Sequence, residues 1–90
     1  MAGRRPSPED VPTPAQAEAL GHLTQGDLVL TEARGHHPIW TREGVQVGHA
    51  IVQQITGSRR WARVYTHEGA IGLRITQAGR AAWRRRLQAA

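Results

Sequence analysis

The stretch that most constrains the fold of this chain is Arg59–Ile75, where two alternating runs flank a short turn. Trp61, Arg63 and Tyr65 fall on one face of the first run, and Ile71, Leu73 and Ile75 on one face of the second. A period of two residues is typical of half-buried strands. Because His67-Glu68-Gly69-Ala70 supplies turn residues between the runs, the sequence predicts an antiparallel hairpin with strands at 59–66 and 71–75.

A helix is predicted directly after this hairpin. Thr76 is a suitable N-cap, and the helix extends from Gln77 to about Ala89. The side chains expected to pack inward are Ala82, Trp83 and Leu87. Those expected to remain in solvent are Arg80, Arg84 and Arg85. The charge run Arg84–Arg86 is typical of a solvated helix face.

The N-terminal part contains a second clear helix start. Thr13-Pro14-Ala15-Gln16 combines an N-cap threonine, proline at the first helical position and glutamine at the third, which is a capping box. Gly26 is expected to end this helix. Residues 1–12 are rich in proline and polar side chains and predict a flexible tail, so residues 13–90 form the one domain.

The middle of the chain is expected to contain two short strands and a helix. The strands are Asp27–Glu32 and Ile39–Thr41, with a loop at Ala33–Pro38. The helix extends from Val45 to Thr56. Its core-facing residues are predicted to be Val47, Ala50, Ile51, Gln54 and Ile55. Its outward residues are predicted to be His49, Val52, Gln53 and Thr56, with Gln46 at the margin.

The composition excludes several classes of protein. Ninety residues with three tryptophans, no phenylalanine and no cysteine can build one thin core without disulfides. No apolar run approaches the length of a membrane span, and no secretory signal is present, so we expect a cytoplasmic protein. The histidines and the seven acidic residues form no metal-ligand, nucleophile–base or carboxylate pattern. We therefore expect no enzyme, cofactor, metal or small-molecule ligand.

Positive charge is concentrated in the C-terminal third. Residues 1–57 contain four arginines and six acidic residues, a net charge of −2. Residues 58–90 contain eight arginines and only Glu68 as an acid, a net charge of +7. Such an asymmetry indicates a polyanionic partner.

The segment from Val45 to Trp83 resembles the recognition helix, wing and final helix of winged helix-turn-helix regulators of the MarR and PadR type. Their wing commonly ends in Leu-Thr-x-x-Gly-Arg, and this chain has Ile75-Thr76-Gln77-Ala78-Gly79-Arg80. The resemblance implies an α+β winged-helix-like domain of order α-β-β-α-β-β-α with a C-terminal β-hairpin wing. The chain departs from the family at Gly35–Trp40, where a loop and strand replace the helix that precedes the recognition helix.

These observations predict a sequence-preferring protein for double-stranded DNA, either a small transcriptional regulator or an accessory factor of a mobile element. The residues predicted to contact DNA are Gln46, His49, Gln53, Thr56, Arg59, Arg60, Arg63, Arg74 and Arg80. Two alternatives stay open. One is a protein-interaction module that keeps the winged fold, and the other is a binder of single strands or RNA that stacks bases on Trp61 and Tyr65. A homodimer also stays open.

Overall fold

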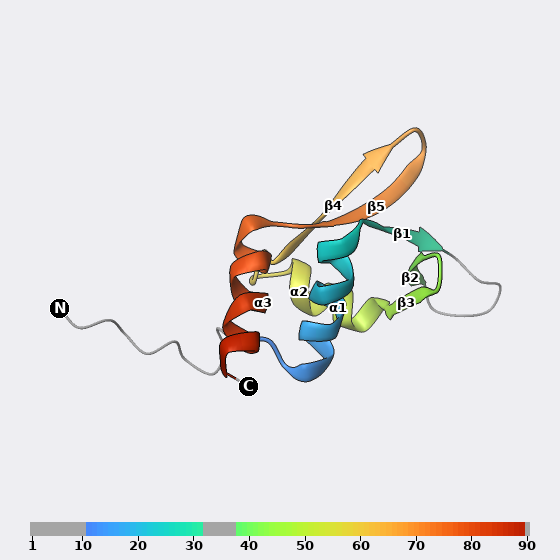
Figure 1. Cartoon of the computed structure of the whole chain (residues 1–90). Coiled ribbons are helices and arrows are strands. Elements are labelled where there is room, and N and C mark those ends of the chain that lie inside the picture. The colour runs from blue at the N-terminus through green and yellow to red at the C-terminus, as the bar shows by residue number, and fades with distance from the viewer. Residues whose placement is uncertain (1–10, 32–37, 90) are drawn as a thin grey trace.

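The computed structural model describes residues 11–31 and 38–89, and within them it forms a three-helix, five-strand α+β domain (Figure 1). The elements in chain order are α1 (Pro14–Gln25), β1 (Leu28–Thr31), β2 (Ile39–Arg42), β3 (Val45–Gly48), α2 (His49–Thr56), β4 (Ala62–His67), β5 (Ala70–Ile75) and α3 (Gln77–Ala89). Residues 1–10 of the predicted tail and 33–37 of the predicted loop lie outside the described residues. Pro12, the last residue of that tail, is buried.

All described strands belong to one antiparallel sheet in the order β3-β2-β1-β5-β4. Two hairpins, β2–β3 and β4–β5, are joined through the central strand β1. The junction with β5 is short, because Leu28 pairs with Leu73 and Val29 with Gly72. The β4–β5 hairpin continues beyond the rest of the domain in Figure 1, so Val64 and Ile71 are exposed although they lie on its core-facing side.

The predicted helix Val45–Thr56 is wrong in its first turn, which is a strand. Val45, Gln46 and Val47 pair with β2. The two-residue turn that makes this possible contains Gly44 at φ 76°, a left-handed conformation that glycine adopts without strain. The predicted order α-β-β-α-β-β-α is therefore replaced by α-β-β-β-α-β-β-α.

The predicted inner face of this helix is corrected as well. Val47 was part of that face, but it lies on β3, and the helix begins only at His49. Without Val47, the inner face is centred on Val52 and Ile55, which are both buried, whereas Ala50 and Gln54 are exposed. The helical pattern of the sequence predicts an outward Val52, but its side chain is buried in the core.

The other helices begin where the sequence predicts. The Thr13 hydroxyl accepts the Gln16 backbone N–H, and the Gln16 side chain accepts the Thr13 N–H, which confirms the capping box of α1. The Thr76 hydroxyl accepts the backbone N–H of Gly79, so Thr76 is the expected cap of α3. Ala82 and Trp83 pack inward as predicted, but Leu87 is 56% exposed because it lies near the end of α3, outside the core.

The hairpin prediction is confirmed with small shifts of its ends. The turn consists of Glu68 and Gly69 at φ 51° and 81°, as expected for a two-residue turn that fits the strand twist. Trp61 immediately precedes β4 and is 4% exposed, as core rather than as a surface aromatic side chain. Trp61 and Ala62 are both buried, so the alternation of buried and exposed residues along this strand begins at Ala62, the first residue of β4.

Gly79 allows α3 to lie directly on the start of the hairpin. A Cβ at Gly79 would overlap the carbonyl oxygen of Trp61 and press on Ile75. The same carbonyl accepts the backbone N–H of Thr76 at 2.9 Å, so it cannot move away without losing that hydrogen bond. The glycine is therefore required by packing.

We expect Gly79→Ala to destabilise the protein. Helix propensity alone would make alanine about 1 kcal/mol more stable than glycine within a helix. The overlap with the Trp61 carbonyl should outweigh this gain and give a net loss of about 1–3 kcal/mol. Urea unfolding monitored by circular dichroism measures the difference, and a stabilised variant would contradict the packing argument.

Candidate nucleic-acid interface

The loop from α2 to β4 places Arg59 and Arg60 at the base of the β4–β5 hairpin. The Trp61 N–H donates to the Ile55 carbonyl at 2.9 Å, and the Thr76 hydroxyl donates to the Arg60 carbonyl at 2.6 Å. These bonds tie the loop to both α2 and the start of α3. The loop that carries Arg59 and Arg60 is thus fixed at its backbone.

Arg60 has a left-handed backbone conformation at φ 55°. This conformation costs a residue with a Cβ roughly 1–2 kcal/mol, and glycine would avoid the cost. The Arg60 side chain is exposed and has no hydrogen-bond or ion-pair partner among the described residues. Nothing in the packing explains an arginine here, which is the kind of strained position that often belongs to a binding surface.

Arg59 and Arg63 differ in their surroundings. The Arg59 guanidinium lies 5.1 Å from the centroid of the Trp61 ring, so this side chain is partly held by a cation–π contact. Arg63 is exposed on the face of the hairpin away from the helices, and its guanidinium has no partner in the described part of the chain. Its direct neighbour across the strands is Arg74.

Arg74 is held by an internal contact, unlike Arg63. Its guanidinium donates to Asp27 Oδ2 at 3.2 and 3.3 Å and lies 4.9 Å from the centroid of the Tyr65 ring. The Tyr65 hydroxyl donates to the same Asp27 oxygen at 2.7 Å, and a Cβ at Gly72 would overlap this ring. Asp27 thus neutralises Arg74, one of the predicted DNA contacts, and fixes the ring of Tyr65 beside it.

This cluster changes the acidity of its members. The hydrogen bond to the Asp27 carboxylate, followed by desolvation, raises the pKa of Tyr65, because ionisation would place a phenolate beside a carboxylate. The same carboxylate also raises the pKa of Arg74. Both protons are therefore held more tightly in the folded protein than in water.

The predicted contacts on α2 are only partly available. Thr56 is half-buried, and its hydroxyl donates to the Val52 carbonyl of its own helix at 2.7 Å. Gln53 is exposed. His49 is half-buried, and its Nδ1 accepts the indole N–H of Trp40 at 3.2 Å. Besides Gln54, which is bonded to Gln16, the helix therefore presents two polar side chains, the free edge of His49 and Gln53.

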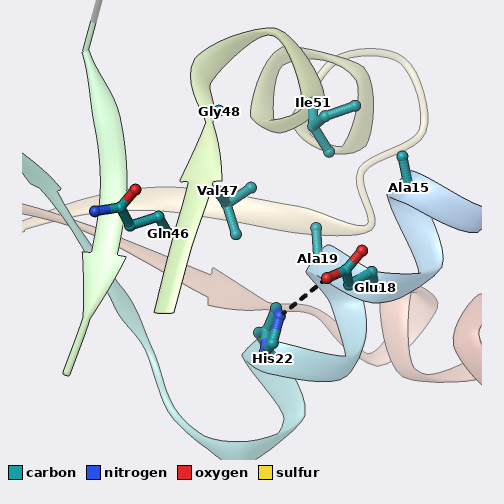
Figure 2. A pocket seen from close by; sticks show the side chains of 8 residues that line it. All are labelled: Ala15, Glu18, Ala19, His22, Gln46, Val47, Gly48 and Ile51. Atoms are coloured by element: carbon teal, nitrogen blue, oxygen red, sulfur yellow. Dashed lines mark ion pairs between the residues drawn. The ribbon is translucent and has the colours of Figure 1, made fainter. Parts of the chain in front are cut away.

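Gln46 is separated from this helix face. It lies on β3, where its side chain points away from α1 (Figure 2). A shallow pocket of about 140 Å³ lies between α1 and the β3–α2 junction, and the Glu18–His22 pair, at 3.8 Å, lines it. Figure 2 shows the side chains around this pocket. Within the described ranges no group of three His, Cys, Asp or Glu side chains is placed to hold a metal ion.

Arg80 is exposed on the first turn of α3, which begins at the base of the hairpin. The predicted site residues thus fall into separate groups: one on α2, one on the β4–β5 hairpin and the loop before it (Arg59, Arg60, Arg63 and Arg74), Gln46 on β3 and Arg80 on α3. Sequence reasoning did not identify Trp40, which donates a hydrogen bond to His49, or Asp27, which binds Arg74. The contacts of Asp27 with Tyr65 and Arg74 join residues 38 and 47 positions apart, so no local spacing signals them.

Comparison of the chain with protein-family models, with curated proteins and with solved structures finds no match in any of the three. No helix in the described part of the chain combines the length and apolar character that crossing a membrane requires.

The chain has one tyrosine, so near-ultraviolet phenolate absorbance reports on Tyr65 alone. We expect its titration midpoint to lie above 10.0 in the wild type and to fall toward that value in Asp27→Asn. Because the folded-state pKa is raised, the contact stabilises the protein at neutral pH, and the stabilisation is lost as the pH rises through that pKa. Equal midpoints in the two proteins, with folding checked by circular dichroism, would show that Asp27 does not hold the hydroxyl.

Proposed function

We propose that this chain is a winged-helix-like protein that binds double-stranded DNA, as a small transcriptional regulator or a mobile-element accessory factor. The β4–β5 hairpin acts as the wing along the phosphate backbone, and α2 faces the bases. The observation that carries the proposal is the pair of arginines, Arg60 and Arg63, that have no partner in the described residues and stand directly after a helix with an uncharged polar face.

The topology supports a winged arrangement in the C-terminal half. The strands β1, β5 and β4 are neighbours in that order, α2 immediately precedes the hairpin and α3 follows it. The β2–β3 hairpin stands where a helix-turn-helix protein has the first helix of its motif. The sheet is thereby extended, and α2 packs against a strand pair and α1 instead of a helix pair.

Phosphate contact is assigned to the base of the wing rather than to its tip. Glu68 lies at the tip, where its carboxylate would repel a phosphate. Arg74 is already bound to Asp27. Arg60 and Arg63 are therefore the guanidinium groups best suited to phosphate oxygens, and Arg59 can join them while it stays on the Trp61 ring.

The two alternatives are less well supported. Stacking of single-stranded bases on Trp61 would require the core to open, because this side chain is 4% exposed. Stacking on Tyr65 would displace the Arg74 guanidinium from its ring. A protein-interaction module without DNA binding predicts no salt-dependent retention of duplex DNA.

Arg63 and Arg74 form a matched pair for testing the wing. We expect Arg63→Ala to weaken duplex binding several-fold and to reduce the slope of log affinity against log salt by about 0.9, the value for one phosphate contact. Arg74→Ala should instead lower the midpoint of thermal unfolding, because it removes the Asp27 contact. Fluorescence anisotropy at several salt concentrations measures the first effect, and an unchanged slope in Arg63→Ala would contradict this assignment of the wing.

Arg60→Gly separates binding from stability. The change relieves the left-handed backbone, so the free energy of unfolding should stay the same or rise by up to about 1 kcal/mol. Duplex affinity should fall, because one guanidinium is lost from the wing base. A variant that is as stable as the wild type and binds DNA equally tightly would exclude Arg60 from the interface.

A further inference from the structure

The side chain of Trp40 determines which nitrogen of His49 carries the proton. Trp40 is 2% exposed on β2, and its indole N–H donates to His49 Nδ1 at 3.2 Å, with 10° between the ring planes. An indole nitrogen can only donate, so Nδ1 must accept. A neutral imidazole with an accepting Nδ1 carries its hydrogen on Nε2.

The Nε2–H group lies on the ring edge away from the buried indole. His49 is the first residue of α2, and Gln53 follows one turn later on the exposed side. The residues around His49 in sequence, Gly48 and Ala50, are exposed and small. Among the described residues, the neighbours of His49 on α2 therefore leave its outer edge open, while Pro38 and Ile39 line the other side of the hollow that it shares with Ala50 and Gln53.

The remaining polar side chains of α2 are already hydrogen-bonded within the protein. Gln54 accepts the Gln16 side-chain amide at 2.8 Å, which links α2 to α1. Thr56 donates to its own helix. The hydrogen-bonding groups left on the exposed side are therefore a fixed donor at His49, the whole amide of Gln53, and the amide nitrogen of Gln54, whose oxygen is bound to Gln16.

We infer that Trp40 makes His49 a donor-only reader that favours guanine over cytosine at one position of the major groove, with Gln53 contacting a neighbouring base. The inference rests on the proposed DNA-binding function. Guanine presents two adjacent acceptors, N7 and O6, and adenine N7 and thymine O4 also accept, whereas cytosine presents only a donor. The opposite tautomer of His49 would accept a hydrogen bond from cytosine instead. Trp40 is thus a positioning residue that decides between a G·C and a C·G base pair.

The first test selects binding sites from a pool of random duplexes with the full chain. The enriched site should contain a guanine whose replacement by cytosine lowers affinity about fivefold or more, the effect of one good base contact. Deazaguanine, which lacks the N7 acceptor, should lower affinity at the same position. His49→Ala should remove the preference there and leave the salt slope of binding unchanged, because the phosphate contacts stay.

The second test removes the indole N–H that fixes the tautomer of His49. Trp40→Phe keeps a buried aromatic ring but lacks the N–H, so the guanine-to-cytosine affinity ratio should fall toward one. Trp83→Phe is the matched control, since it removes an indole N–H from a partly buried tryptophan of α3 without touching His49. Nitrogen NMR of the free protein should show the His49 proton on Nε2 in the wild type and in the control, and a mixture of tautomers in Trp40→Phe.

The outcomes distinguish this inference from the function on which it rests. Duplex binding without any enriched sequence, or a guanine preference that survives in His49→Ala, would overturn the role of His49. A preference that survives in a folded Trp40→Phe would overturn the role of Trp40. If Trp40→Phe does not fold, the His49 tautomer measured in the wild type decides, and a proton on Nδ1 overturns the role of Trp40. Absence of salt-dependent duplex binding would overturn the proposed function itself.

Discussion

Three consecutive residues at the junction of α1 and β1 hold the domain together. The Gly26 carbonyl accepts a hydrogen bond from the Arg42 guanidinium at 2.6 Å, so the end of α1 is tied to β2. Asp27 binds the β4–β5 hairpin through its carboxylate. Leu28 is fully buried and pairs with Leu73 in the centre of the sheet. Because β1 is the strand through which the two hairpins meet, this junction ties both hairpins to the end of α1.

The junction also divides the arginines by role. Arg42 satisfies carbonyl groups at the end of α1, which would otherwise lack intrahelical partners. Arg74 is neutralised by Asp27. The positive charge of the C-terminal third is therefore not a uniform patch. Among the described residues, Arg60 and Arg63 at the base of the β4–β5 hairpin have side chains without a hydrogen-bond or ion-pair partner, and so do Arg80, Arg84 and Arg86 on α3. Charge counted along the sequence predicts a polyanionic partner, but only the pairing in the folded chain indicates which guanidinium groups can meet it.

Features with a local physical cause could be predicted from the sequence, and features that need a distant partner could not. The Thr13 capping box, the Thr76 cap and the Glu68-Gly69 turn each depend on neighbouring residues, and the structure contains all three. The prediction for segment 45–48 is wrong because Val-Gln-Val-Gly is too short for its alternation to be told from the start of a helix, and its conformation is decided by pairing with β2. The Trp40–His49 bond was missed because it exists only once β3 is a strand and brings the start of α2 beside β2.

If α2 reads bases as proposed, the fold explains how a helix of such low intrinsic stability can do so. It has eight residues, several of them β-branched, and the Gly48 cap offers no side-chain hydrogen bond. Val52 and Ile55 anchor it in the core, Trp40 holds its beginning and Gln16 holds its exposed side. A helix held at these points presents few side chains, but it presents them in a defined orientation. Under the proposed function, phosphate contacts of the wing would then supply most of the affinity, and α2 would discriminate over only a few base pairs.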